Sequence, residues 1–323
     1  MELICLTLLL LCYSVQKIQR EDVETSASKK EYIKWVDCKV SSEALDCAYA
    51  YDVDTYGQKV HLNWIELIAY AAAKNGGEFP KSAVKDIRSA AEQLINKETT
   101  MKKLTKKLEY YPYFLEVYHA VLDGYVGEYE MEKTHEKKYG LKAYAPIAKG
   151  FPYSDYDDFG VSRSYGYKRE HLGHDMMGQI GTPIICVLSG TVEALGWNQY
   201  GGWRIGIRSR DHKKYYYYAH LRQNYPYAKG LKVGDEVTAG EVIGYMGHTG
   251  YSTKENVNNI QTVHLHFGMQ LIFDESQKDG NTEIWINPYA IVRFLHQHQA
   301  EAAKVGDTKE WRNVNPIRDM DME

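Results

Sequence analysis

Residues 261–271, Gln-Thr-Val-His-Leu-His-Phe-Gly-Met-Gln-Leu, alternate between apolar and polar side chains. Every odd position from 263 to 271 is apolar, whereas His264, His266 and Gly268 occupy even positions. Because side chains alternate across a strand, this pattern predicts a strand with one face built for a core and two imidazoles, roughly 6–7 Å apart, on the other. Two histidines on one face, beside a glycine that leaves room, suit a metal ion and a water molecule.

A second group of metal-binding residue types lies at residues 169–175, Arg-Glu-His-Leu-Gly-His-Asp. His171 and Asp175 are separated by an even offset, so an extended chain directs both to one face, while His174 points away. Imidazole and carboxylate are both normal zinc ligands, and three protein ligands plus one water are typical of a catalytic site. His171, Asp175 and His266 are therefore the predicted ligands of one Zn²⁺ per chain.

A run of consecutive tyrosines leads to His220, at the end of another predicted strand. A histidine there, free of the metal, can stabilise charge on a tetrahedral intermediate or pass protons. It is predicted to share a face with Tyr216 and Tyr218, which we expect to line a substrate groove, since tyrosine supplies broad amphipathic contact area. The loop before the first ligand adds further groove candidates: Asp157, Asp158, Arg163 and Tyr165.

Three short motifs occur in a fixed order: His-x-Gly-x-Asp at residues 171–175, Tyr-Ala-His-Leu at 218–221 and His-Leu-His-Phe at 264–267. Together with the glycine-rich residues 234–250, this trio resembles the lysostaphin/LytM-type zinc metalloendopeptidases, which cut peptidoglycan peptides. The resemblance covers about residues 160–272. It implies an antiparallel β domain of the duplicated-hybrid-motif type and a hydrolase that cleaves peptide bonds in peptidoglycan cross-links or stem peptides.

By the same resemblance, zinc is held by His171, Asp175 and His266, while His220 and His264 are catalytic residues that do not bind the metal. We assign general-base catalysis to His264 and oxyanion stabilisation to His220, although the two could share or exchange these tasks. The chain departs from the family in a longer loop before His264. That loop leaves open which bond is cut: a glycine bridge, a D-Ala cross-link or a stem peptide.

One alternative is a catalytically inert peptidase-like module that binds cell wall or activates another wall hydrolase. Such a module is expected to lose a ligand or a catalytic histidine, whereas all five positions are filled here. A second His-x-His pair, His296 and His298, lies in a predicted helix. There an offset of two residues corresponds to about 200° around the axis, so these imidazoles diverge and are not predicted to bind metal.

The whole chain is predicted to be α+β, with a small helical domain at residues 32–134 and the β domain at residues 135–300. Residues 301–323 are expected to form a loose polar tail. The predicted helices start at Ser41 or Ser42, at residue 61, after a Ser82 cap, and at residues 101, 114 and 287. The predicted strands are residues 182–188, 190–195, 203–208, 213–220, 237–242 and 263–272, with a hairpin turn at 200–202.

Residues 3–15 are an apolar run dominated by leucine. The run is too short for a membrane span of roughly 20 residues and suits the core of a signal peptide. However, no Lys or Arg precedes it, and Lys17 and Arg20 follow it, which is the opposite of the usual asymmetry for export. We expect residues 1–31 to be a signal peptide or membrane anchor with a tether, and the catalytic domain to lie outside the cytoplasm.

Net charge and cysteine content give no reason to expect nucleic-acid binding or a disulfide framework. The formal net charge of −4 gives no reason to expect nucleic-acid binding. Five cysteines do not make a disulfide framework in 323 residues. Cys186 lies in an apolar run and is predicted to be a buried thiol, and Cys38 could pair with Cys47. The oligomeric state stays open.

Overall fold

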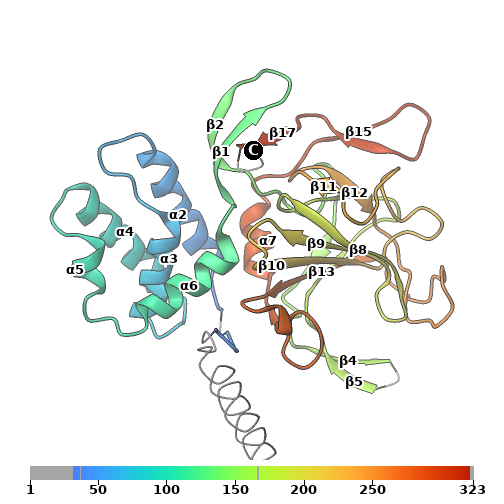
Figure 1. Cartoon of the computed structure of the whole chain (residues 1–323), viewed down its shortest axis with the longest axis horizontal. Coiled ribbons are helices and arrows are strands. Elements are labelled where there is room, and N and C mark those ends of the chain that lie inside the picture. Colours follow the sequence, from blue (N-terminus) through green and yellow to red (C-terminus); the bar gives the residue numbers. More distant parts are fainter. Residues whose placement is uncertain (1–31, 37, 166, 321–323) are drawn as a thin grey trace, which may run out of the picture. The chain divides into compact units, whose positions relative to one another are not determined.

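A computed structural model of the chain describes residues 32–36, 38–165 and 167–320, except for the side chains of Tyr165 and Tyr167 (Figure 1). Trp35–Glu323 forms one compact unit. The predicted signal peptide or anchor, residues 3–15, lies outside the described residues. Within the described ranges, no helix combines the length and the apolar character needed to cross a membrane.

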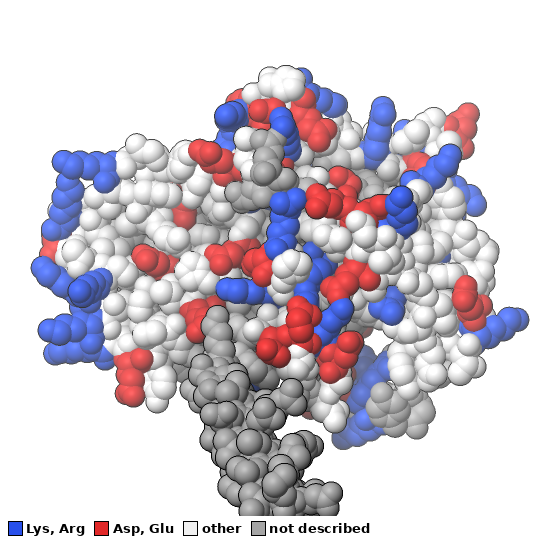
Figure 2. Space-filling view, in the orientation of Figure 1, with Lys and Arg blue, Asp and Glu red and all other residues white. Residues whose placement is uncertain are grey.

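The first part of the compact unit is helical, as the sequence predicts. The helices are α2 (Ser42–Thr55), α3 (Trp64–Lys74), α4 (Lys81–Ile95), α5 (Met101–Thr105) and α6 (Tyr111–Leu122). The predicted cap of α2 is confirmed, because the Ser41 hydroxyl accepts a hydrogen bond from the Ala44 amide at 3.2 Å. Figure 2 shows Lys and Arg side chains gathered over the end that carries α4 and α5, with both charge signs mixed over the middle of the face.

Several helix starts differ from the prediction; α6, for example, begins at Tyr111 and not at residue 114. The third helix of the sequence, α4, begins at Lys81 after Pro80 and has no side-chain cap, so the Ser82 cap is wrong. Proline fixes φ near the helical value and lacks an N–H to satisfy, so it can begin a helix without a capping side chain. The helix expected from residue 61 begins at Trp64, because the Asn63 side chain caps it by accepting from the Ile65 amide at 2.8 Å.

The second part is an antiparallel β domain, which confirms the predicted α+β class. Its main sheet has the strand order β11-β8-β9-β10-β13-β6-β3, with β14 paired to β13. These strands are β3 (Ser154–Asp155), β6 (His174–Met177), β8 (Gly190–Asn198), β9 (Gly202–Ser209), β10 (Lys214–Ala219), β11 (Glu236–Val237), β13 (His264–Leu271) and β14 (Ile284–Ile286).

Smaller sheets surround the main one. A three-stranded sheet has the order β17-β1-β2, and three two-stranded sheets pair β12 with β7, β15 with β16 and β4 with β5. Their bounds are β1 (Val126–Met131), β2 (Lys137–Leu141), β4 (Ser162–Tyr165), β5 (Tyr167–Glu170), β7 (Pro183–Ile185), β12 (Val242–Tyr245), β15 (Ala302–Lys304), β16 (Trp311–Asn313) and β17 (Ile317–Asp319). A final helix, α7 (Tyr289–Leu295), lies inside the predicted residues 287–298.

The central strand β13 has the two faces that its alternation predicts. Leu265, Phe267 and Leu271 are fully buried on the core side. The opposite side carries His264 and His266, and β6 and β10 pair with β13 on its two edges. The strand therefore has its apolar row in the core, and its neighbours on both sides can contribute residues to the histidine face.

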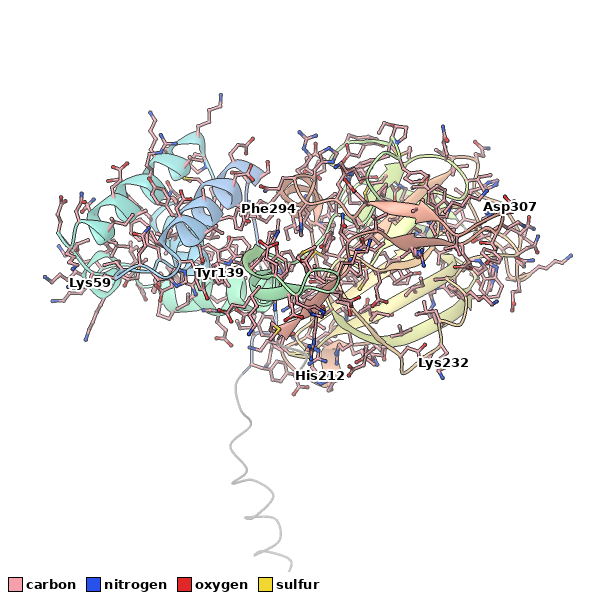
Figure 3. All side chains as sticks on the ribbon, turned by 90° about the horizontal axis from the view of Figure 1, so that it is seen from above. Lys59, Tyr139, His212, Lys232, Phe294 and Asp307 are labelled. Carbon is pink, nitrogen blue, oxygen red and sulfur yellow. The ribbon has the colours of Figure 1, made fainter. Side chains whose placement is uncertain are left out.

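Hydrogen bonds join the helices to the β strands. The Tyr139 hydroxyl of β2 donates to the buried Asp52 of α2 at 2.6 Å. On α7, the Phe294 ring packs edge-on against Tyr49 of α2 with a centroid separation of 5.7 Å. Tyr139 and Phe294 are both labelled in Figure 3, on the side toward the helices. The domain boundary near residue 135 stays a prediction; α6 ends at Leu122 and β1 begins four residues later.

The expectation of a loose tail is wrong for residues 302–319, which form β15, β16 and β17. Ile317 of β17 is buried, and β17 pairs with β1. The Lys142 ammonium also contacts the Asp319 carboxylate at 2.6 Å, with side chains only 1% and 5% exposed. The polar composition concealed this role because the buried groups are few and their partners are distant in sequence.

Replacing Asp319 by alanine should lower the free energy of unfolding by about 3–5 kcal/mol, because it leaves the Lys142 ammonium buried without this carboxylate. Denaturant unfolding measures the change. The control is Glu301→Ala, which removes an exposed partner of Lys149 and should have little effect. Equal midpoints for Asp319→Ala and the unsubstituted protein would show that β17 contributes little to stability.

Candidate metal centre

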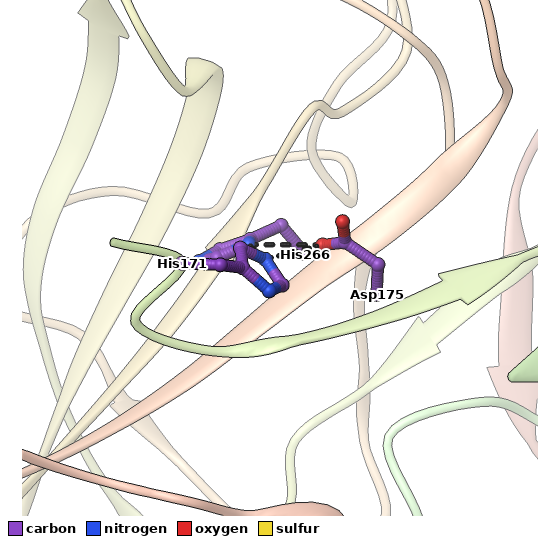
Figure 4. Close-up of side chains that lie close together, drawn as sticks. All are labelled: His171, Asp175 and His266. Atoms are coloured by element: carbon purple, nitrogen blue, oxygen red, sulfur yellow. Dashed lines mark hydrogen bonds and ion pairs between the residues drawn. The ribbon is translucent and has the colours of Figure 1, made fainter. Parts of the chain in front are cut away.

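Three side chains from separate parts of the β domain converge in the structure (Figure 4). His171 follows β5, Asp175 lies in β6, and His266 lies opposite Asp175 in β13. The His171 Nε2 lies 2.9 Å from Asp175 Oδ1 and 2.8 Å from His266 Nδ1, and His266 Nδ1 lies 3.0 Å from Asp175 Oδ1. The residues that the sequence predicts as metal ligands are thus brought together.

This donor set fits a divalent metal ion. Two imidazole nitrogens and one carboxylate oxygen are normal ligands of zinc, with bonds of roughly 2.0–2.2 Å. Around a tetrahedral ion such bonds place neighbouring ligand atoms about 3.3–3.5 Å apart. The three atoms, at 2.8–3.0 Å, need to separate by only a few tenths of an ångström.

A buried carboxylate, Asp158, fixes the orientation of the His171 ring. The Asp158 backbone carbonyl lies 3.0 Å from His171 Nδ1. Since a carbonyl only accepts, Nδ1 carries the proton, and Nε2 faces the centre as the ligand atom. The Asp158 carboxylate in turn accepts from Arg163 at 2.7 Å. The sequence offered Asp158 only as a groove residue; no local pattern shows that its loop folds back onto His171.

Charges in the centre are strongly coupled. Burial opposes protonation of His171, yet hydrogen bonds to Asp158 and Asp175 raise its pKa to about 9. Burial disfavours the ionised Asp175 carboxylate, but hydrogen bonds from His171 and His266 hold its pKa well below the usual range. Burial lowers the pKa of His266, although Asp175 opposes this shift. A metal ion must therefore compete with a proton at His171, and its affinity should rise with pH toward 9.

Two further histidines lie beside the three ligand residues. The His220 and His264 rings are 4.7 Å apart between centroids. The Nδ1 of His264 lies 2.8 Å from the Thr262 carbonyl, and the Nδ1 of His220 lies 3.0 Å from the Thr249 carbonyl. Both carbonyls require an Nδ1 proton, so Nε2 is the nitrogen of each ring that can exchange a proton with a substrate or water. Burial, followed by the neighbouring histidines, lowers the pKa of His220 well below its usual value.

The predicted groove role of Tyr216 and Tyr218 is wrong. Both are fully buried, and Tyr218 lies opposite Phe267 of β13, on the core face. The prediction extended the strand alternation through His220, but this residue has φ +62° and follows the last residue of β10. It is instead Tyr217 that faces the centre, with its ring 5.9 Å from that of His266.

The centre opens into a cavity of about 710 Å³. Arg163 lines this cavity, as predicted, and its guanidinium lies 3.5 Å from the Asp175 carboxylate. The Tyr165 side chain lies outside what the structure describes. Residues 259–262 of the longer loop also line the cavity, so that loop borders the centre.

The second His-x-His pair has separate surroundings. His298 Nδ1 contacts the Ala143 carbonyl at 2.8 Å, whereas His296 Nδ1 lies 3.4 Å from the Tyr153 hydroxyl. In the described ranges, the group able to hold a metal comprises His171, Asp175 and His266. The predicted helical placement of this second pair is wrong, because α7 ends at Leu295 and both histidines follow it.

Gly173 provides the space that the His266 ring occupies. A Cβ at position 173 would lie 2.5 Å from His266 Cε1 and 2.8 Å from the Phe267 carbonyl oxygen. We expect Gly173→Ala to displace the ring and lower metal affinity by about 10- to 100-fold, as loss of a supporting contact does. Competition with a chromophoric chelator measures this affinity.

The control for Gly173→Ala is Gly150→Ala. Gly150 has φ +84° and no atom within 4 Å of an added Cβ, so this substitution strains the backbone without approaching the centre. It should cost some stability and leave metal affinity unchanged. Equal affinity in Gly173→Ala and the unsubstituted protein would show that the ring has room to move.

Comparisons with known proteins point to one family. The profile described as Peptidase family M23 matches residues 169–279, which include all five histidine and aspartate positions. L-Ala–D-Glu endopeptidase of Bacillus subtilis (strain 168) is 36% identical over 51% of the chain and 50% of its own length. Lysostaphin of Staphylococcus simulans is 37% identical over 37% of the chain and 20% of its own length. The chain thus spans half or less of these relatives.

A solved structure shares the fold over most of the chain. A candidate glycyl-glycine endopeptidase, LytM, of Ruminococcus gnavus superposes with a TM-score of 0.53 and 24% identity. The match covers 80% of this chain and 88% of that one. It therefore extends beyond the β domain.

Proposed function

Because residues 169–279 form a domain of peptidase family M23, we propose that the chain is a zinc-dependent endopeptidase that hydrolyses peptide bonds of peptidoglycan. The observation that carries this proposal is the convergence of His171 Nε2, Asp175 Oδ1 and His266 Nδ1, with His220 and His264 beside them. The names of the relatives support the reaction class, since they include an L-Ala–D-Glu endopeptidase and a glycyl-glycine endopeptidase.

The residues around the centre have chemically distinct tasks in this proposal. Zinc held by His171, Asp175 and His266 would polarise the scissile carbonyl and lower the pKa of a bound water toward 7. His264, whose Nδ1 is held by the Thr262 carbonyl, presents Nε2 as the general base. His220, held in the same tautomer, can stabilise the oxyanion by hydrogen bonding once it has gained a proton at Nε2.

The lowered pKa of His220 bears on how general-base catalysis and oxyanion stabilisation are divided between the two histidines. The lowered pKa makes the His220 ring neutral near pH 7, so it cannot donate from Nε2 until a proton reaches it. The His264 ring is 4.7 Å from the His220 ring between centroids and is well placed to pass such a proton on. We therefore propose that proton transfer between the two rings accompanies the reaction.

The test is digestion of peptidoglycan by the purified full chain. Soluble products and their new amino termini are identified by mass spectrometry, which also shows which bond is cut. We expect cleavage that stops with a chelator and returns when zinc is restored. Intact peptides after incubation with folded, zinc-loaded protein would overturn the enzyme and favour a module that only binds the wall. The proposed location outside the cytoplasm follows from the proposed substrate.

A further inference from the structure

A second cavity adjoins the metal centre on the same side of the main sheet. Its volume is about 650 Å³, and it shares four lining residues with the first cavity: Leu172, Tyr200, Tyr217 and His266. Because a peptide cut at the centre must extend away from it on both sides, this space is a natural path for one end of the substrate.

Strand register places an arginine in this second cavity. His266 lies opposite Ala219, and Tyr218 lies opposite Ile205, so the next residue, Arg204, faces Ala219 one strand farther on. Residues directly opposite one another share a face, and strands lie roughly 4.8 Å apart. The Arg204 backbone is therefore about 10 Å from that of His266, and the small Ala219 stands between them.

Glycines let aromatic rings form the floor between these two residues. A Cβ on Gly206, which lies opposite Tyr217, would overlap the Tyr215 ring. A Cβ on Gly268 would lie 2.7 Å from the Trp285 ring. Arg204 and Tyr215 both line the second cavity, and the guanidinium opposes the rise that burial causes in the pKa of the Tyr215 phenol.

The charge of Arg204 is not neutralised by a neighbouring acid. No ion pair with a carboxylate is found for Arg204 within the described ranges, and its Nε is buried without a hydrogen-bond acceptor. Other acids of the cavity already have partners: Glu193 contacts Lys278, and Glu283 accepts from the Trp285 indole at 2.7 Å. Asp279 is exposed.

The other arginines near the centre are already engaged. Arg163 pairs with Asp158. Arg169 donates to the Tyr251 hydroxyl at 2.6 Å and stacks over the Tyr200 ring at 4.9 Å. Among the arginines that line the two cavities, Arg204 is thus the one with neither an ion pair nor a cation–π contact in the described ranges.

We propose that Arg204 is a specificity residue that binds a carboxylate on the substrate, within about one to three residues of the cleaved bond. An extended peptide rises about 3.3–3.6 Å per residue, so this spacing matches the 10 Å between backbones. The proposal rests on the proposed peptidase function and narrows its substrate class. It favours a peptide with a free side-chain or terminal carboxylate, such as one containing glutamate, over a run of glycines.

The test uses two synthetic peptides, acetyl-L-Ala-D-Glu-L-Lys amide and its D-Gln counterpart, which differ only in carboxylate against primary amide. Calorimetry measures their dissociation constants with the chelator-treated full chain, so binding is read without any cleavage. We expect the carboxylate peptide to bind about 10- to 100-fold more tightly, because a hydrogen bond between two charged groups is stronger than one to a neutral amide. Arg204→Met should remove this difference, and Arg204→Lys should restore part of it.

Arg169→Met is the matched comparison, because Arg169 lines the first cavity and not the second, so its removal should leave the difference between the two peptides in place. Equal binding of both peptides to the unsubstituted chain would overturn the proposal. Persistence of the difference in a folded Arg204→Met protein, or its loss in Arg169→Met, would overturn it as well. Failure of the peptidase function appears separately, as absence of cleavage by the zinc-loaded chain.

Discussion

His266→Ala should reduce bound zinc from about one ion per chain to near zero and bring peptidase activity down to background. The substitution removes one of three protein ligands, and the remaining His171 and Asp175 provide only two donor atoms. Zinc is measured by elemental analysis after dialysis, and activity by release of new amino termini from peptidoglycan. Circular dichroism shows whether the variant is folded.

The control for this variant is His296→Ala. His296 belongs to the same His-x-His pattern but lies at the end of α7, outside the centre. It should keep both zinc and activity. Full zinc occupancy in His266→Ala would show that the ion is held by other residues, and the ligand set derived from the convergence of side chains would be wrong.

His264→Ala should keep zinc and lose about 10²- to 10⁴-fold in kcat/KM, the usual contribution of a positioned acid–base group. The ring is close to the ligands, since its Nε2 lies 3.7 Å from Asp175 Oδ1, yet its Nδ1 is engaged with the Thr262 carbonyl. Removing it therefore leaves the three donor atoms intact. Elemental analysis and steady-state kinetics on the same preparation separate metal loss from catalytic loss.

His220→Ala makes the assignment of roles testable. Loss of a general base and loss of an oxyanion stabiliser both lower kcat. Loss of the base, however, also removes the acidic limb of the pH–rate profile. We expect that limb to disappear in His264→Ala and to remain in His220→Ala. The reverse result would exchange the two roles. Loss of zinc from His264→Ala would instead make His264 a ligand.

The strand carrying His264 and His266 could be predicted because its alternation is uninterrupted over residues 263–271. The same parity argument paired His171 with Asp175, and the two side chains do meet, although a bend at Gly173 lies between them. It failed at Tyr216 and Tyr218. A single positive φ at the following histidine ends the alternation, and no residue type in the sequence indicates it.

Contacts between distant segments account for the other failures. Asp158 positions His171 only because its loop returns to that ring, a contact between residues 13 apart in the chain. The strands at residues 302–319 could not be foreseen from composition, since β17 depends on hydrogen bonding to the distant β1, and β15 pairs with β16. For the helices, the Ser41 cap predicted the start of α2, but no residue pattern indicates what the helical domain binds.

The three-stranded sheet β17-β1-β2 has a consequence for the order of folding. Lys142 and Asp319 are 177 positions apart, and the edge of β1 is covered only when β17 arrives. During synthesis the ribosome must therefore reach residue 319 before the Lys142 ammonium can contact the Asp319 carboxylate. Until then, β1 presents an open edge that can pair with other chains. The growing chain therefore remains prone to aggregate through the open edge of β1 until β17 pairs with that edge.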